Sequence, residues 1–311
     1  MTELIRDRYE PLVVVGEGGE GRIVKARDLQ HDRFVALKLR AVATDDDRDL
    51  MLNQARVLLA LSPHANLALV RDDFFEDHHY VIVMDWVDGV DLGRVLQTRG
   101  RPGLSPSSVV GWLAEAADAL THLHTRDPPV IHGDVKPASL VLTRGGHIVL
   151  VDFGVSTVSG SRAQRPGTPG FAAPELLTEG PGRASDVYAL AATAFTLLTG
   201  APPNGTPSMW NGINPEQAAA LETAIRAGLA TSPERRPATP GEFVERLRAG
   251  WGSTLPTGVL TFCLSDIEGS TQAWERDPSS MARALVRHDQ IIAETVESHG
   301  GRFLKLSLIH I

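Results

Sequence analysis

The stretch of sequence that decides the fold is His-Gly-Asp-Val-Lys-Pro at residues 132–137, followed by Asp-Phe-Gly at residues 152–154. Asp152 comes eighteen residues after Asp134. That separation suits one β-hairpin, with Asp134 on its first arm and Asp152 after its second. A carboxylate that accepts a proton and a carboxylate that binds magnesium form the pair used in phosphoryl transfer. The two acidic residues therefore predict chemistry on a phosphate group.

Five further motifs accompany this stretch in order along the chain. They are Val-Gly-Glu-Gly-Gly-Glu-Gly-Arg-Ile at 15–23, Val-Ala-Leu-Lys at 35–38, Gly-Thr-Pro-Gly-Phe-Ala-Ala-Pro-Glu at 167–175, Ser-Asp-Val-Tyr-Ala-Leu at 185–190 and Pro-Glu-Arg-Arg-Pro at 233–237. Together the six motifs resemble the eukaryotic-like Ser/Thr protein kinases of bacteria. A glycine-rich loop alone is weak evidence, because such loops also occur in dinucleotide-binding folds, whereas six ordered motifs are hard to obtain by chance.

The resemblance implies an α+β protein over residues 9–250, with the two-lobed protein kinase fold. Its smaller lobe would be an antiparallel β-sheet with one helix, and its larger lobe would be mainly α. The residue patterns agree with that order, because valine- and leucine-rich runs between turn residues predict strands and a 3.6-residue apolar period predicts helices. The predicted strands are 12–15, 23–26, 34–39 and 80–84, and the predicted helices are 50–61, 109–124 and a buried helix at 187–198.

The resemblance also implies an ATP site. Glycines allow the backbone to approach a phosphate closely, and the amides between them donate to its oxygens. By resemblance, Ile23 and Ala36 would cover one side of the adenine and Val141 the other, while Asp85 and Val87 would offer backbone groups. The predicted ATP-binding residues are Val15, Gly16, Glu17, Gly18, Gly19, Glu20, Gly21, Ile23, Ala36, Lys38, Asp85, Val87 and Val141.

By the same resemblance, four residues are predicted to be catalytic. Lys38 would neutralise phosphate charge, and Lys136 would meet the transferring γ-phosphate. Asp134 would accept or orient the proton of the substrate hydroxyl, and Thr168 would contact Asp134 and indicate a serine or threonine acceptor. Asp152 would bind the Mg²⁺ that bridges the β- and γ-phosphates.

Three positions depart from the family's pattern. Gln54 stands where the helical glutamate partner of Lys38 is expected, and Gly133 replaces an arginine that commonly reads a phosphorylated activation loop. Ser139 stands where the second metal ligand is normally asparagine, and its hydroxyl is a weaker oxygen ligand for Mg²⁺. These departures keep open a pseudokinase, an ATP-binding module that regulates an attached domain without transferring phosphate.

Several other residues are interpreted as structural. The resemblance implies a buried ion pair between Glu175 and Arg236 and a structural role for Asp186. The four histidines without ligand spacing are interpreted as solvated or capping residues, and they are His78, His79, His122 and His124.

The end of the chain resembles a second family. Residues 251–257 are predicted to be a linker, and Asp266, Ile267 and Lys305 lie in a strand–helix–strand pattern over 258–306. This pattern is similar to the opening of a class III adenylate/guanylate cyclase domain, which would be an incomplete βαβ fragment of a ferredoxin-like fold. Residues 307–311 are expected to be a non-native tail. The resemblance also implies a dimer through the full-length cyclase domain. A further alternative is that the whole protein is mainly a nucleotide cyclase, with the kinase part as its sensor.

Composition limits the remaining possibilities. The chain has 311 residues, 42% of them hydrophobic, and a formal net charge of −8, which gives no general attraction to nucleic acid or anionic membranes. Cys263 is the only cysteine, and the first residues are polar, so we expect a cytoplasmic protein. The expected partners are protein substrates, including the chain itself, and the expected cofactors are ATP and Mg²⁺.

Overall fold

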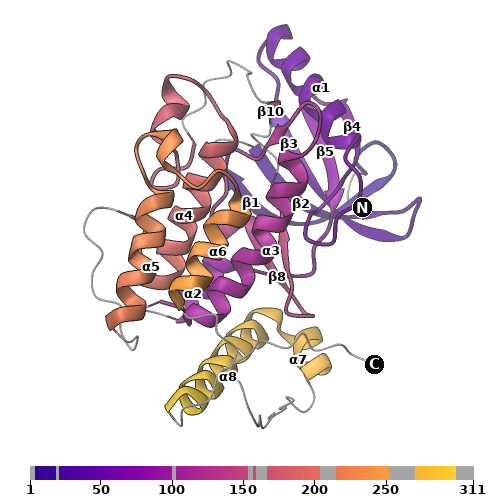
Figure 1. Ribbon diagram of the computed structural model, residues 1–311. Helices are drawn as coiled ribbons and strands as arrows, with labels where there is room; N and C mark the ends of the chain where they lie inside the picture. Colours follow the sequence, from indigo (N-terminus) through magenta and orange to yellow (C-terminus); the bar gives the residue numbers. More distant parts are fainter. Residues whose placement is uncertain are drawn as a thin grey trace. The chain divides into compact units, whose positions relative to one another are not determined.

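A computed structural model describes residues 4–18, 21–99, 103–152, 157–158, 167–203, 215–251 and 270–298. The chain forms two compact units, Met1–Val87 and Asp88–Ile311 (Figure 1).

The first unit is built on an antiparallel sheet of five strands in the order β1-β2-β3-β5-β4. The strands are β1 (Tyr9–Gly18), β2 (Gly21–Asp28), β3 (Arg33–Ala41), β4 (Val70–Glu76) and β5 (His79–Asp85), and the unit also contains helix α1 (Asp45–Leu59). Thr44 begins α1 by accepting a hydrogen bond from the N–H of Asp47, and three aspartates in the first turn suit the positive end of the helix dipole. The four predicted strands and the predicted helix are confirmed, whereas β4 was not predicted.

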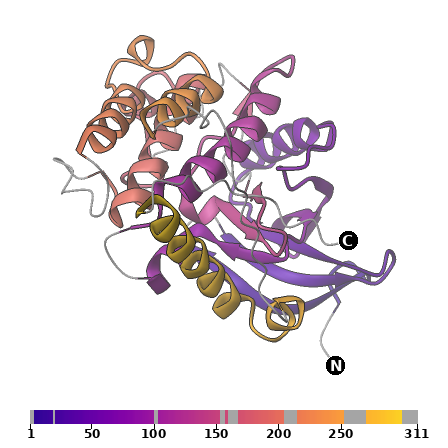
Figure 2. The same cartoon turned by 60° about the horizontal axis from the view of Figure 1, so that its bottom comes forward.

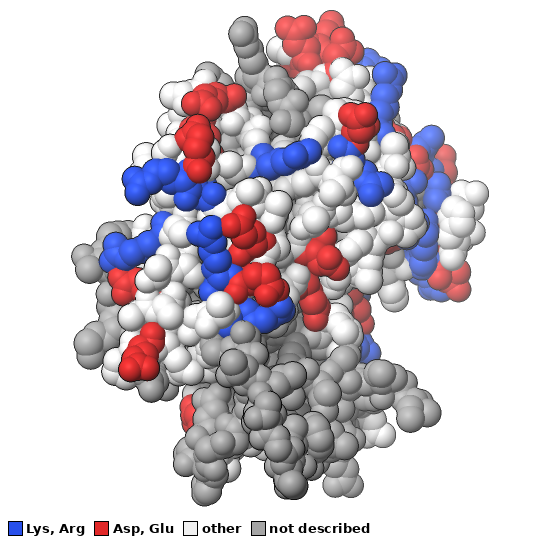
Figure 3. Space-filling model, viewed as in Figure 1, with Lys and Arg blue, Asp and Glu red and all other residues white. Residues whose placement is uncertain are grey.

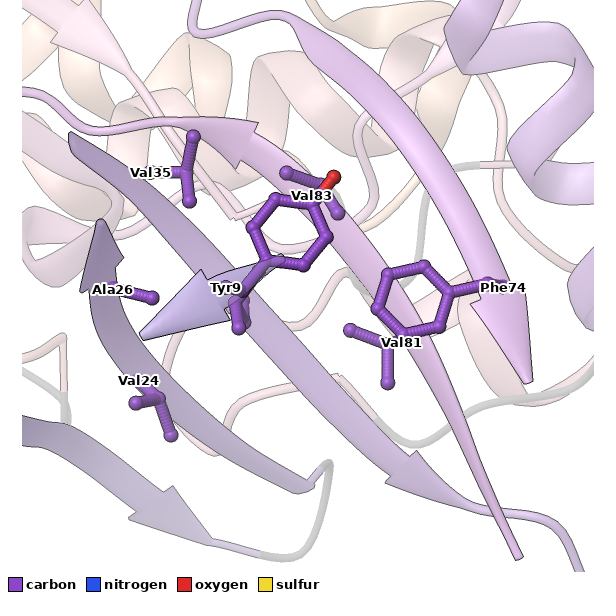
Figure 4. Packing of buried hydrophobic residues seen from close by; sticks show 8 residues of the cluster. Tyr9, Val24, Ala26, Val35, Phe74, Val81 and Val83 are labelled. Atoms are coloured by element: carbon purple, nitrogen blue, oxygen red, sulfur yellow. The ribbon is translucent and has the colours of Figure 1, made fainter. Parts of the chain in front are cut away.

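One face of this sheet carries the core of the first unit. Side chains from β1 to β5 point toward one another there (Figure 4). In the centre, Val24, Leu37 and Val83 form one cross-strand row, because Val24 pairs with Leu37 and Leu37 pairs with Val83. The rings of Tyr9 and Phe74 stack with centroids 5.7 Å apart. Since side chains alternate along a strand, the neighbouring residues occupy the opposite face.

The second unit is mainly helical. Its kinase-like part contains α2 (Leu92–Arg99), α3 (Pro106–His124), α4 (Arg183–Thr199), α5 (Pro215–Gly228) and α6 (Pro240–Trp251). Helices α3 to α6 pack side by side (Figures 1 and 2). Every side chain of α4 from Ala189 to Leu198 is buried, which confirms the predicted buried helix.

Short strands and turns complete this part. Strands β6 (Gly89–Asp91), β8 (Leu140–Thr143) and β9 (Ile148–Leu150) form one small sheet, and β7 (Val130–Ile131) pairs with β10 (Thr157–Val158). Among the described residues, single-turn 3₁₀ helices lie at Pro137–Ser139, Pro174–Leu177 and Pro233–Arg235.

Two packed helices, α7 (Ser270–Arg276) and α8 (Pro278–Ser298), follow. Helix α8 confirms the helix predicted within the strand–helix–strand pattern of residues 258–306. The predicted strands on each side of them, with Asp266, Ile267 and Lys305, lie outside the described residues. Trp251 was predicted to begin the linker but belongs to α6, where its carbonyl accepts a hydrogen bond from Gln217. Among the helices that the structure describes, none has the length and apolar character of a membrane span.

Charged side chains of both signs are interspersed on the face shown in Figure 3. Exposed charges of the described residues also pair locally, as in Arg27 with Asp32 and Arg226 with Glu222. These pairs are exposed, so each contributes little to stability.

Candidate active site

The predicted hairpin between the two key aspartates is present in the second unit. Strands β8 and β9 pair from Leu140 with Leu150 onward, and the N–H of Val151 donates to the carbonyl of Ser139 at 2.9 Å. Asp134 lies in the loop before β8, and Asp152 follows β9 by two residues. Local strand pairing therefore connects the segment that carries Asp134 to the segment that carries Asp152.

Asp134 is bound by Lys136 and Thr168. The Thr168 hydroxyl donates to Oδ1 of Asp134 at 2.6 Å, and the ammonium of Lys136 contacts Oδ2. The Lys136 ammonium also lies 2.8 Å from the Thr168 hydroxyl oxygen. The three side chains form a closed hydrogen-bonded triangle, which brings together three of the four residues that were predicted to be catalytic.

This triangle has a defined electrostatic character. The Asp134 side chain is 3% exposed, whereas that of Lys136 is 23% exposed. The carboxylate is therefore largely removed from water and stabilised by a cation and a hydroxyl, and the cation still reaches solvent. Such a group can orient a hydroxyl that approaches it, while the neighbouring ammonium can meet a negatively charged phosphate.

His132 positions the backbone of the same loop. Its Nδ1 accepts from the N–H of Asp134 at 3.3 Å, so the proton of the neutral ring is on Nε2, which donates to the carbonyl of Val151 at 3.2 Å. His132 is fully buried. One imidazole thus joins the loop of Asp134 to the residue before Asp152.

Asp186, at the start of α4, binds the backbone of the loop that carries Asp134. Its Oδ2 accepts from the N–H of His132 at 2.9 Å and its Oδ1 from the N–H of Gly133 at 2.8 Å. Burial by itself would raise the pKa of Asp186, but the hydrogen bonds from His124 and from the N–H of Gly133 outweigh it. The pKa of Asp186 is therefore lowered, and the carboxylate is charged.

His124 corrects a prediction. It was interpreted as solvated or capping, but its side chain is 6% exposed and its Nε2 lies 2.8 Å from Oδ2 of Asp186. A sequence signal for this position exists, because His124 continues the spacing of the buried residues Leu113, Ala117 and Leu120 along α3.

Gly133 has a backbone conformation that explains its residue type. Its φ is +79°, in the left-handed region where glycine has no Cβ penalty. An arginine there would have to adopt this φ at a cost. Glycine at position 133 therefore allows the left-handed backbone of the loop. It does not supply the positive charge of the arginine that is common at this position.

Ser139 is engaged by its own turn. Its hydroxyl donates to the carbonyl of Lys136 at 2.8 Å and accepts from the N–H of Lys136 at 2.9 Å, and the residue is 1% exposed. The hydroxyl thereby uses its proton and one of its two lone pairs locally. One lone pair of the hydroxyl oxygen remains for the predicted metal contact.

Asp152 has a left-handed backbone with a φ of +70°, which aspartate tolerates better than most residues. It is half-buried. Within the residues described, no group of three or more histidine, cysteine or acidic side chains could hold a metal alone. The Asp152 carboxylate is an oxygen donor of the kind that divalent cations such as Mg²⁺ take from proteins.

In the first unit, Lys38 is 3% exposed on β3. It shares the sheet face opposite the core with Ile23, its cross-strand partner, and with Ala36. Both apolar residues are half-buried. The structure therefore gathers a cation and two apolar side chains on one surface, as a nucleotide site on this unit would need.

The described glycines of the loop differ in their constraints. A Cβ added to Gly21, whose φ is +114°, would lie 2.1 Å from the carbonyl oxygen of Leu39. A Cβ added to Gly16 or Gly18 would meet no described atom within 4 Å, so open space lies beside them. Gly19 and Glu20 lie outside the described residues.

The remaining predicted ATP-binding residues divide between the units. Val15 is half-buried and Glu17 exposed on β1, and Val87 is the last residue of the first unit. Asp85 uses its N–H on the carbonyl of Leu69, at 2.9 Å. Val141 is half-buried on β8 of the second unit.

The predicted ion pair between Glu175 and Arg236 is confirmed. Two guanidinium nitrogens of Arg236 donate to the two carboxylate oxygens at 2.5 and 2.8 Å. Arg236 also donates to the carbonyls of Ala184, Ala230 and Thr231. The ion pair therefore ties the segment of Pro174–Leu177 to the start of α4 and to the turn before α6.

Residues 9–238 match the family described as the protein kinase domain. The chain belongs to the protein kinase domain family. The kinase domain is 30% identical over 204 residues to serine/threonine-protein kinase PrkC of Bacillus subtilis, an alignment that covers 63% of this chain and 31% of PrkC. It is 38% identical over 203 residues to serine/threonine-protein kinase PknF of Mycobacterium tuberculosis, covering 61% of this chain and 42% of PknF.

Solved kinase domains agree with the fold. The crystal structure of the Mycobacterium tuberculosis PknI kinase domain is 28% identical and superposes with a TM-score of 0.65, covering 80% of this chain and 99% of that chain. These similarities confirm the prediction of a serine/threonine protein kinase domain with an antiparallel sheet and a helical lobe. The chain spans less than half the length of the two curated relatives named above.

Proposed function

We propose that this kinase domain transfers the γ-phosphoryl group of ATP, with Mg²⁺, to serine or threonine hydroxyls of protein substrates, including its own. The observation that supports this most directly is the closed triangle of Asp134, Lys136 and Thr168. Each of its members has the chemical character that its proposed step needs. We also propose that the protein is cytoplasmic, which the single cysteine of the chain, Cys263, supports.

In the proposed reaction, Asp134 accepts a hydrogen bond from the substrate hydroxyl. This hydrogen bond orients the hydroxyl oxygen toward the phosphorus of the γ-phosphate. Thr168 keeps the carboxylate oriented, because both its hydroxyl and its N–H donate to Oδ1. Lys136 stabilises the charge that develops on the transferring group. Mg²⁺, when held by Asp152, would neutralise charge on the β- and γ-phosphates. Lys38 would neutralise charge on the phosphates of the nucleotide.

The pseudokinase alternative draws on Gln54, Gly133 and Ser139. A pseudokinase has no need for an intact triangle around Asp134, so the triangle favours transfer. Gly133 and Ser139 both form hydrogen bonds that hold the loop of Asp134. The loop therefore has its own structural support without the arginine and asparagine that are usual at these two positions.

The test is transfer of radiolabelled phosphate from ATP by the full chain to itself and to a general acceptor protein. Asp134→Asn should lower transfer about 100-fold or more, because it removes a group that acts in the transition state. ATP binding should persist in the variant, measured by calorimetry. Wild-type transfer that is no higher than that of Asp134→Asn, with ATP still bound, would establish the pseudokinase.

We also propose that residues 258–306 begin a class III nucleotide cyclase domain. Support comes from the Asp-Ile-Glu-Gly-Ser-Thr motif at 266–271 and from Lys305. A two-metal reaction needs more ligands than Asp266 supplies. The 311-residue chain should therefore form no cyclic nucleotide, measured against Asp266→Ala, and activity above that control would contradict an incomplete domain.

A further inference from the structure

The connection that leaves the sheet of the first unit begins at Trp86, one residue after β5 ends. Asp85 is still held by the sheet, because its N–H donates to Leu69 and its carboxylate accepts from Arg71 at 2.7 Å. Trp86 lies beyond the strand, and its buried indole N–H has no hydrogen-bond partner among the described residues. The Trp86 side chain is therefore held by something other than a hydrogen bond.

Lys25 on β2 provides that contact. Its Nζ lies 4.6 Å from the ring centroid of Trp86 and 4.5 Å from the ring centroid of Phe34. An ammonium over an aromatic face is attracted by the negative charge of the ring's quadrupole. No carboxylate of the described residues forms an ion pair with Lys25, and the contacts of its ammonium among these residues are with the two rings. We call Lys25, Phe34 and Trp86 the lysine clamp.

The strand register places the clamp beside the predicted adenine surface. Lys25 lies directly opposite Ala36, and Ala36 lies opposite Met84 on β5. Because side chains alternate along a strand, Phe34 and Ile23 share this face with Lys25 and Ala36. The clamp and the two apolar residues predicted to cover the adenine are therefore neighbours on one face of one sheet.

We propose that Lys25 is a positioning residue for ATP binding. By holding the Trp86 ring, it fixes the backbone between Asp85 and Val87, which is where the base of the nucleotide would find hydrogen-bonding groups. A segment that is ordered before the ligand arrives loses less conformational freedom on binding, so affinity rises. This inference rests on the proposed function, since it assigns the clamp to the nucleotide of that reaction.

The clamp leads to a specific pattern among three variants. Lys25→Met keeps an apolar stem and removes the cation, so the Kd and KM for ATP should rise about fivefold while kcat stays unchanged. Lys25→Arg keeps a cation over the rings and should stay within about twofold of the wild type. Arg27→Met is the matched control, because Arg27 lies two residues along the same strand and is paired with exposed Asp32 instead.

The experiment measures Kd for ATP by calorimetry on the full chain, KM and kcat by phosphate transfer, and amide hydrogen exchange of residues 85–88 without nucleotide. Faster exchange and weaker ATP binding in Lys25→Met, with neither change in Lys25→Arg or Arg27→Met, would support the clamp. Wild-type exchange or wild-type Kd in Lys25→Met would overturn it, as would equal losses in Lys25→Arg.

A double-mutant cycle provides a second check. If the cation acts through the ring, Lys25→Met should add nothing to the change in Kd already caused by Trp86→Leu. Additive effects would overturn the proposal. Absence of ATP binding by the wild type would overturn the proposed function together with this inference, whereas normal wild-type binding with an unaffected Lys25→Met would overturn this inference alone.

Discussion

Nε2 of His124 lies 2.8 Å from Oδ2 of Asp186, and the two residues are separated by 62 positions in the chain. The contact joins the end of α3 to the start of α4, behind the loop that carries Asp134. Because Asp186 is charged, the His124 ring donates through Nε2–H. The same carboxylate accepts from two backbone N–H groups of the loop, so His124 acts on the site through Asp186.

We expect His124→Leu to lower the free energy of unfolding by about 1–3 kcal/mol, because the buried carboxylate loses a donor. His124→Gln, which keeps an N–H donor, should lose less. Transfer of phosphate should fall in His124→Leu through kcat with little change in KM for ATP. Urea unfolding and steady-state kinetics measure both effects, and a His124→Leu protein with wild-type stability would contradict this role.

The lowered pKa of Asp186 also leads us to expect that the free energy of unfolding decreases at acidic pH. Its folded-state pKa lies below the ordinary value of 3.8, so the unfolded chain binds more protons than the folded chain as the pH falls past that value. Its contribution should be fully present above the ordinary pKa and decline as the pH falls through the folded pKa. Urea unfolding between about pH 6 and pH 3 measures this dependence, and Asp186→Asn should flatten it. An equal slope in that variant would assign the dependence to other carboxylates.

The ion pair of Glu175 and Arg236 should matter far more to stability than a surface pair. Glu175→Gln leaves a buried guanidinium without its carboxylate and should cost about 3–5 kcal/mol. Glu222→Gln is the control, since its pair with Arg226 is exposed on α5, and it should cost about 0.3–0.5 kcal/mol. Similar unfolding midpoints for the two variants would show that the buried pair contributes no more than the exposed one.

Gln54→Glu should preserve or raise activity, by no more than about tenfold, because it adds a charge-assisted partner for the cation of Lys38. Gln54 is half-buried on α1, whereas the adjacent Asn53 is exposed. Asn53→Asp therefore adds the same charge to the same helix away from the sheet and should leave activity unchanged. A sharp loss of transfer in folded Gln54→Glu would show that position 54 is not the partner of Lys38.

Much of the fold could be predicted from local patterns. The alternation of β2, β3 and β5 and the apolar period of α3 and α4 are properties of short segments, so they are visible in the sequence. Strand β4 was missed because Val-Arg-Asp-Asp-Phe-Phe-Glu has three adjacent charged residues, which hide the buried Val70 and Phe74. The contact between Asp134 and Thr168 was predicted from motifs in the same way, since both residues lie in compact stretches of sequence.

By itself, the sequence determined the order of the elements, the hairpin between Asp134 and Asp152 and the residue types available for chemistry. Only the tertiary structure decided that His124 is bound to Asp186, that the Ser139 hydroxyl is used within its own turn and that Lys25 lies between two aromatic rings. A local pattern states which face of a strand or helix a residue occupies. Which distant group it meets there depends on packing between segments far apart in the chain, and that packing determines burial, hydrogen bonding and charge state.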